Sequence, residues 1–302
     1  SNEYEILLES GTNELEIIEF EMGLHRYGIN VIKVKEIILP MPVTPIPHAH
    51  PAIEGIIQLR GEVLPVINME KVMGLPQTFD HDQGKYIVAM FNKQHVVFHV
   101  HDVTQIHRIS WEQIEKPSDI YSQDSSQVIG VIKRGDDMLL LLDFEKIILD
   151  INPATGIHVE QVKKLGSRKR SEKHIVIAED SPLLRKLLHD TLNEAGYGNL
   201  TFFENGRDAL NYLESIVEED DQFDIREEVQ LVITDIEMPQ MDGHHLTKRI
   251  RDNQALAPLP VIIFSSLITN DLKHKGESVG ADDQVSKPEI AELVLKIDQY
   301  IV

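Results

Sequence analysis

The hydrophobic pattern changes its period about halfway along the chain. In the first half, apolar and polar residues alternate, as in LEIIEFEMG over residues 15–23. This alternation is typical of half-buried β-strands. It returns in YGINVIKV, GIIQLRGEVLPVIN, KYIVAMF, HVVFHVHDV, QVIGVIKRGD and MLLLLDF. We therefore predict a mostly β first half with a barrel-like architecture.

From residue 174 onward, short apolar runs alternate with stretches of helical period. The runs are HIVIAE, LTFFE, LVITD, PVIIFSS and DQVSK, and a helical stretch follows each of them. The first helix has Ser181 as N-cap, Pro182 at its first position and Gly196 as its stop signal. Five strands alternating with five helices predict an α/β domain with a doubly wound parallel sheet.

A basic stretch separates these two halves. Residues 152–173 carry little apolar content after Val162, and KKLGSRKRSEK combines Lys and Arg with Gly and Ser. Such a stretch can bind acidic partners or lipid, but in so acidic a chain it favours a flexible linker. We therefore predict domains at 1–151 and 174–302, joined by a basic linker at 152–173.

Composition narrows the possible partners. The chain has 302 residues, 42% of them apolar, which is enough for two cores. A net charge of −21 argues against nucleic acid as a partner, and no apolar run approaches membrane-spanning length. The absence of cysteine excludes disulfides and cysteine-bound zinc. We expect a cytoplasmic protein with no nucleic-acid partner and no membrane insertion.

The α/β half places polar side chains where its strands end. Ligands of open α/β sheets bind at the carboxyl ends of the strands. The first strand ends in Glu179 and Asp180, the third in Asp235, the fourth in Ser265 and the fifth in Lys287. We expect these side chains to meet at one edge of the sheet.

This combination suits phosphoryl transfer. Carboxylate oxygens and waters suit Mg²⁺, an aspartate can form an acyl phosphate, and a lysine with a hydroxyl can neutralise phosphoryl oxygens. Any one of these acidic residues is more often a helix cap or a solvated charge. Their joint occurrence at four strand ends favours a functional site.

The segment 174–302 resembles the response-regulator receiver domain along its whole length. The resemblance rests on EDS at 179–181, DIEMPQMDG at 235–243, SS at 265–266 and SKP at 286–288. It implies a flavodoxin-like fold with Asp235 as the phosphoacceptor. It also implies Mg²⁺ as the cofactor, held by Glu179, Asp180, Asp235 and the backbone carbonyl of Glu237.

The same resemblance assigns two further roles. Ser265 is the switch hydroxyl, and Lys287 senses the phosphoryl group and precedes a cis bond to Pro288. Gln284 departs from the family pattern, because receivers usually carry an aromatic residue at this position. We therefore expect the switch to rely on Ser265 and loop movement.

The first half resembles the CheW-like coupling domain over roughly residues 12–150. The matching features are Val34-Lys35-Glu36-Ile37, the pattern GxxxLRGxxxPV from Gly55 to Val66, and VIGVIKRGDDMLLLLDFEKII. The resemblance implies two small intertwined β-barrels that bind the histidine kinase CheA and the cytoplasmic tips of chemoreceptors. Glu36, Arg60 and Gly61 are the implied partner-binding residues. Asn68 replaces the family's usual aspartate.

Fused to a receiver, such a domain implies a chemotaxis adaptor that couples chemoreceptors to CheA and is tuned by phosphorylation of Asp235. It implies no enzyme activity beyond the receiver's own phosphorylation and dephosphorylation. A phosphate sink that drains the kinase is the alternative. A transcriptional regulator is disfavoured, because the acidic first half offers no basic recognition helix.

The histidines invite a metal-site interpretation, which their spacing does not favour. His99 and His101 alternate with the apolar residues Phe98 and Val100, so they share the opposite face of a strand. A transition-metal site needs several converging ligands. We therefore predict surface histidines at these positions, and also at His48, His50, His244 and His245.

Overall fold

The computed structural model of the chain describes residues 11–117, 127–218 and 222–301. The chain divides into two compact units. The β unit comprises Leu15–Ile109 and Gln113–Thr155, and the α/β unit comprises Gly156–Val302 with the short segments 11–14 and 110–112. In the described part of the chain, no helix is long and apolar enough to cross a membrane. The domain boundaries at 151 and 174 stay predictions.

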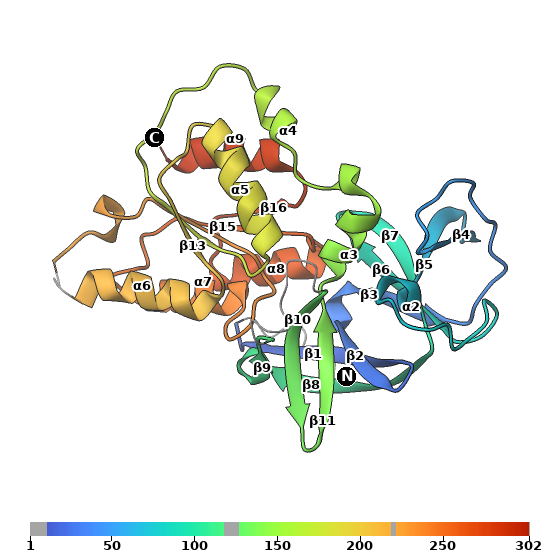
Figure 1. Cartoon of the computed structure of the whole chain (residues 1–302). Helices are drawn as coiled ribbons and strands as arrows, with labels where there is room; N and C mark the ends of the chain where they lie inside the picture. Colours follow the sequence, from blue (N-terminus) through green and yellow to red (C-terminus); the bar gives the residue numbers. More distant parts are fainter. Residues whose placement is uncertain (1–10, 118–126, 219–221, 302) are drawn as a thin grey trace. The chain divides into compact units, whose positions relative to one another are not determined.

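The β unit contains two sheets, as the alternating sequence predicts (Figure 1). The six-stranded sheet has the order β8-β1-β2-β11-β10-β9, and the five-stranded sheet has the order β3-β6-β7-β5-β4. The strands are β1 Glu14–Met22, β2 His25–Asn30, β3 Val34–Ile38, β4 Ile53–Leu59, β5 Glu62–Asn68, β6 Lys85–Phe91, β7 Gln94–Val100, β8 Asp102–Ser110, β9 Ile114–Glu115, β10 Val128–Arg134 and β11 Asp137–Leu142.

Helices are short in this unit, and the longest of them closes its core. Among its described residues, the helices are α2 Met69–Val72 and α3 Phe144–Ile151, and 3₁₀ turns lie at Val31–Lys33 and Pro153–Thr155, with a further turn at Trp111–Gln113 where the chain passes between the units. Phe144 contacts Phe20 of one sheet and Phe98 of the other, with ring centroids 6.3 and 4.8 Å away. Because all three rings are buried, α3 joins the two sheets through one apolar core.

The α/β unit has the predicted parallel sheet, with strand order β13-β12-β14-β15-β16. The three inner strands β12, β14 and β15 are nearly continuous in apolar residues and buried at every position, because helices cover both faces of the sheet. The elements are α4 Val159–Lys163, β12 Ile175–Ala178, α5 Pro182–Glu194, β13 Leu200–Phe203, α6 Gly206–Glu218, a 3₁₀ turn Ile225–Glu227, β14 Leu231–Thr234, α7 Gly243–Asp252, β15 Val261–Ser265, α8 Asn270–Val279, β16 Asp283–Ser286 and α9 Ile290–Tyr300.

Local signals set the helix ends as expected. The Ser181 hydroxyl accepts a hydrogen bond from the Leu184 amide at 3.3 Å, and Pro182 occupies the first turn of α5. Gly196 follows the end of this helix with a left-handed φ of 101°. Both predictions are confirmed, so α5 begins directly after Glu179 and Asp180.

Candidate functional site

The strand order brings the predicted acidic residues together. The chain passes from β12 outward to β13 and then back to β14, so the order reverses beside β12. Ala178 and Thr234 are partners in the register of β12 and β14, and each is followed directly by a carboxylate. Glu179 and Asp235 therefore lie at the point where open α/β sheets bind their ligands.

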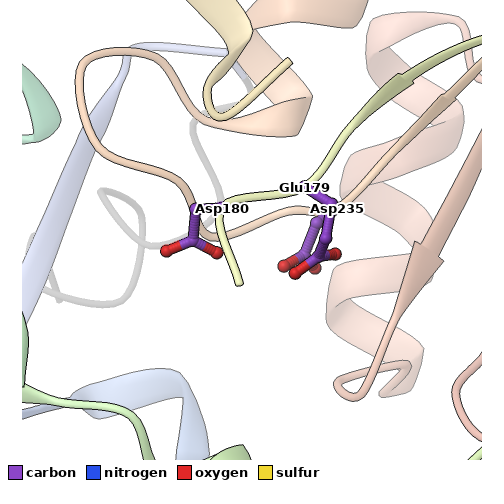
Figure 2. A group of neighbouring side chains, drawn as sticks. All are labelled: Glu179, Asp180 and Asp235. Atoms are coloured by element: carbon purple, nitrogen blue, oxygen red, sulfur yellow. The ribbon is translucent and has the colours of Figure 1, made fainter. Parts of the chain in front are cut away.

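The carboxylates of Glu179, Asp180 and Asp235 form one group. Figure 2 shows the side chains of Glu179 and Asp235 close together, with Asp180, the residue that follows Glu179, to their left. One oxygen of each residue lies within 4.8 Å of the others. Glu179 and Asp235 are buried, whereas Asp180 is partly exposed. Hard oxygen donors at this spacing fit a divalent cation such as Mg²⁺.

Lys287 completes this group with a positive charge. Its Nζ lies 2.9 Å from Oε2 of Glu179 and 3.5 Å from Oδ2 of Asp235, and its side chain is buried. Its backbone amide donates to the Ser265 carbonyl at 2.9 Å, and the peptide bond to Pro288 is cis, as expected. Three carboxylates against one ammonium leave an excess of negative charge, which favours a cation.

The predicted switch hydroxyl lies on the neighbouring strand end. Ser265 is the last residue of β15, is buried, and pairs in register with Ser286, the residue before Lys287. Its hydroxyl accepts a hydrogen bond from the Leu267 amide at 3.2 Å. Glu237, the expected carbonyl ligand, lies in the loop between β14 and α7.

The loop after Asp235 requires the residues Asp242 and Gly243. A Cβ added at Gly243 would lie 1.8 Å from the backbone oxygen of Asp235, so only glycine allows this close approach. Asp242 caps α7 by accepting from the His245 amide at 2.7 Å, and burial raises the pKa of its carboxyl. The DG pair of the motif therefore fixes the backbone around Asp235.

Arg185 is a site residue that the sequence reasoning missed. Its Nη1 donates to the backbone carbonyls of Glu179 and Asp180, both at 2.8 Å, and Nη2 lies 3.5 Å from the Glu204 carboxylate. The guanidinium thus holds the loop that carries the acidic pair. The available signal was a cation in the second turn of the helix that follows this pair.

The implied partner-binding residues of the β unit lie together at the β4–β5 turn, where Arg60 forms an ion pair with Glu36. Arg60 and Gly61 make the two-residue connection between β4 and β5, with φ angles of 50° and 83°. The Arg60 guanidinium holds both carboxylate oxygens of Glu36, with Nη2 to Oε2 at 2.8 Å. This bidentate bond lowers the pKa of Glu36. The turn therefore closes the β4–β5 hairpin, and Glu36 of β3 is held against it by an ion pair.

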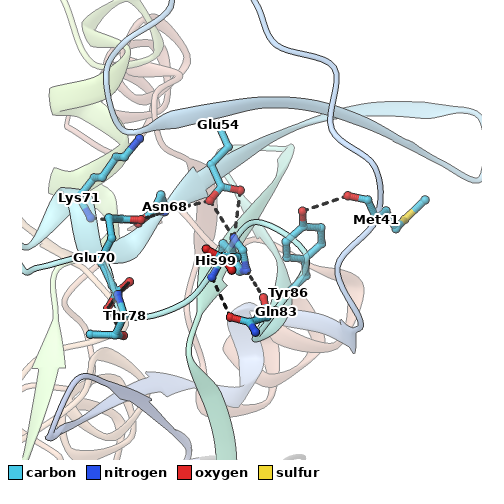
Figure 3. Close-up of polar contacts among 11 residues, drawn as sticks. Met41, Glu54, Asn68, Glu70, Lys71, Thr78, Gln83, Tyr86 and His99 are labelled. Atoms are coloured by element: carbon cyan, nitrogen blue, oxygen red, sulfur yellow. Dashed lines mark hydrogen bonds and ion pairs between the residues drawn. The ribbon is translucent and has the colours of Figure 1, made fainter.

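The prediction of surface histidines is wrong at His99. This residue is fully buried, because β7 is the central strand of its sheet and both its faces are covered. Figure 3 shows its Nδ1 at the Glu54 carboxylate, 2.9 and 3.0 Å away, while Nε2 lies 2.6 Å from the Gln83 carbonyl. The imidazole is therefore part of a buried polar network, and among the residues that the structure describes it belongs to no group of three or more potential metal ligands.

Asn68 joins the same network. Its Nδ2 donates to Glu54 at 2.9 Å, and its Oδ1 caps α2 by accepting from the Lys71 amide at 3.0 Å (Figure 3). An aspartate could make the cap but could not donate to Glu54. The departure from the family pattern therefore keeps the local cap and adds a bond.

His244 is the second histidine for which the prediction is wrong. It lies in the first turn of α7 and is almost completely buried, and burial lowers the pKa of its imidazole to about 3. Its ring is thus neutral near pH 7. His48, His50 and His101 are exposed, as predicted, whereas His245 is partly buried.

The comparisons with known proteins identify both halves. Residues 16–152 match the model of the CheW-like domain, and residues 175–298 match that of the response regulator receiver domain. The fold and the site thus define a coupling domain joined to a receiver. The chain is 31% identical over 282 residues to Chemotaxis protein CheV3 of Helicobacter pylori, covering 89% of both chains. It therefore belongs to the CheV family of chemotaxis proteins and is a coupling adaptor with a receiver domain.

Other relatives match the whole chain or one part of it. Chemotaxis protein CheV1 of Helicobacter pylori is 23% identical, with 96% of this chain and 94% of that protein covered. The scaffolding protein TtCheW of Thermoanaerobacter tengcongensis, a solved structure, is 28% identical with a TM-score of 0.40. That likeness covers 42% of this chain and 88% of the other.

Proposed function

We propose that the receiver of this adaptor is phosphorylated on Asp235 and that phosphorylation tunes the coupling of chemoreceptors to CheA in the cytoplasm. The observation that supports it is the contact of the Lys287 ammonium with both Glu179 and Asp235. A buried lysine beside clustered carboxylates neutralises charge where an anionic group must be accepted. CheA and the chemoreceptor tips as partners, and Mg²⁺ as the cofactor, are proposed because of the family to which the chain belongs.

The chemistry assigns a task to each side chain. An Asp235 oxygen attacks the phosphorus of a phosphohistidine, an O–P bond forms, and the P–N bond breaks with its electron pair leaving on the imidazole. Lys287 and the Ser265 hydroxyl stabilise the charge of the transferred phosphoryl oxygens. Glu179, Asp180, Asp235 and the Glu237 carbonyl would hold Mg²⁺, which supplies further charge neutralisation when bound.

The phosphoacceptor is tested by labelling. We expect Asp235→Asn to abolish labelling by phosphorylated CheA and by a small phosphodonor, because an amide cannot form the acyl phosphate. EDTA should abolish labelling of the unmodified protein, and added Mg²⁺ should restore it. Asp190→Asn, an exposed aspartate in α5, is the matched control. Undiminished labelling of the Asp235 variant would refute this assignment.

The coupling surface is tested by a charge reversal at the β4–β5 turn. Arg60 is 71% exposed at its side chain, so we expect Arg60→Glu to weaken CheA binding at least tenfold without unfolding the protein. Arg26→Glu is the control, because Arg26 is also exposed and paired with an acidic residue, Asp137. Affinity is measured by titration and folding by circular dichroism. Unfolding by Arg60→Glu would make the residue structural and exclude the partner-binding role.

The phosphate-sink alternative makes a different prediction for the same variants. If the receiver only drains phosphoryl groups, beryllium fluoride bound at Asp235 leaves the affinities for CheA and for receptor fragments unchanged. If phosphorylation tunes coupling, at least one of these affinities changes, and Asp235→Asn removes the change. The two functions are therefore distinguished by binding, independently of labelling.

A further inference from the structure

From Gly156 onward, the basic stretch between the two predicted domains belongs to the compact α/β unit. Its composition predicts a flexible linker, but Ile157 and Val162 are buried and α4 packs against α5 and α9 (Figure 1). We call residues 156–173 the arm. The prediction of a flexible linker is wrong for this segment, because Ile157 and Val162, five residues apart, are buried against the receiver.

An ion pair ties the basic part of the arm to the last helix. The Arg168 guanidinium contacts the Asp298 carboxylate on α9, and its Nε donates to the Ala195 carbonyl at 2.7 Å. The Tyr197 hydroxyl donates to the same carboxylate, and burial together with this bond raises the pKa of Tyr197. Arg168 is 17% exposed and Asp298 33%, so this pair is more shielded than a typical surface ion pair.

Backbone contacts continue along the arm. The Ser171 amide donates to the Gly196 carbonyl at 2.9 Å, and Arg170 Nη1 donates to the Asn193 carbonyl at 2.9 Å. A Cβ at Gly196 would lie 2.4 Å from the Lys169 carbonyl oxygen. Gly196 therefore both ends α5 and lets the backbone of the arm approach this helix closely. The basic residues Arg168 and Arg170 make specific hydrogen bonds to the receiver.

The two helices beneath the arm both begin at the acidic site. α5 starts at Pro182, just after Glu179 and Asp180, and α9 starts at Ile290, just after Lys287 and Pro288. The arm thus packs on the two helices whose first turns adjoin the phosphoacceptor group. A displacement of Asp180 or Lys287 upon phosphorylation would move a helix against which the arm is held.

We propose that the α5–α9 surface is the docking site of this chain's own arm, and that the state of Asp235 sets how tightly the arm is held. The arm is then the output element of the receiver, leading directly into the chain of the coupling domain. This inference rests on the proposed phosphorylation of Asp235. In this proposal the arm is a segment with a bound and a released state, and not a flexible linker that only connects the two domains.

Amide hydrogen exchange of the whole chain tests this directly. In the unmodified protein we expect the amides of 159–173 to exchange at least tenfold more slowly than unstructured peptide. Arg168→Ala and Asp298→Asn should each remove most of that protection at 168–173. Lys169→Ala, an exposed neighbour, is the control and should change nothing. Arm amides that exchange as fast as free peptide in the unmodified protein would refute docking.

Beryllium fluoride with Mg²⁺ tests the dependence on Asp235. We expect a change of at least threefold in arm exchange in the unmodified protein and none in Asp235→Asn. The amides of 235–243 serve as the internal reference for occupancy of the site. If they respond and the arm does not, the output role is refuted while the phosphoacceptor stands. If 235–243 does not respond either, the proposed function itself fails.

Discussion

At the scale of single residues, Arg185 matters because it acts on the backbone of the acidic loop. Its guanidinium donates to two consecutive backbone carbonyls, those of Glu179 and Asp180. It therefore fixes the backbone from which both carboxylate side chains extend. Residues that orient metal ligands typically contribute tenfold or more to affinity. Arg185 is therefore a positioning residue for the proposed Mg²⁺ site.

We expect Arg185→Ala to weaken Mg²⁺ binding by about tenfold, in line with the usual cost of losing a group that orients a ligand. Labelling of Asp235 should slow at low Mg²⁺ and recover when Mg²⁺ is raised, because the ligands themselves remain. Titration calorimetry measures the affinity. Lys186→Ala, its exposed neighbour on α5, should leave it unchanged. A labelling defect that saturating Mg²⁺ does not correct would contradict the positioning role.

Sequence alone predicted the residues whose place follows from topology. Glu179, Asp235 and Ser265 end or follow parallel strands, so knowing the strands was enough to bring them to one edge. Arg185 and His99 could not be found this way. Arg185 acts through helix geometry and a flexible side chain. The burial of His99 depends on β7 being the central strand of its sheet, and the alternation along one strand does not reveal that position.

At the scale of elements, Gln284 links β16 to α8. Its Nε2 donates to the Lys273 carbonyl at 2.7 Å, and among the described residues its buried Oε1 has no hydrogen-bond partner. A Cβ at Gly276 of α8 would lie 2.3 Å from this oxygen. The amide therefore lies against α8, two strand positions before Ser286 and three before Lys287.

We expect Gln284→Ala to loosen α8 without preventing phosphorylation. The lost hydrogen bond contributes about 1 kcal/mol, which is enough to speed amide exchange in α8 severalfold. Gly276→Ala should act in the same direction, because its Cβ would displace the amide. Ser278→Ala, an exposed site on α8, is the control. Loss of Asp235 labelling in Gln284→Ala would show that the amide belongs to the acceptor site itself.

The arm shows why element prediction fails for short amphipathic pieces. α4 spans only Val159–Lys163, too short to form by itself in water. Its stability comes from burying Val162 against α5 and α9, and this surface exists only after the receiver has folded. A basic composition therefore predicted exposure for a segment that tertiary contacts hold in place.

At the scale of the whole molecule, the two units have separate apolar cores. One core cluster gathers Phe20, Phe98 and Phe144 with their neighbours in the β unit, and another gathers Val176, Leu213 and Val232 in the α/β unit. Neither cluster contains residues of the other unit. Domains with their own cores can unfold in separate transitions, so the whole chain should not be treated as two-state.

We therefore expect two unfolding transitions that can be shifted independently. Phe144→Ala should destabilise the β unit by about 3–5 kcal/mol, because it opens a cavity where α3 joins the two sheets. Beryllium fluoride with Mg²⁺ should stabilise only the α/β unit, since a ligand raises the stability of the fold that binds it, and Asp235→Asn should abolish that effect. Scanning calorimetry combined with hydrogen exchange assigns each transition to its unit. A single transition that shifts as a whole with either change would show that the units fold as one, and coupling between receiver and adaptor would then operate through global stability.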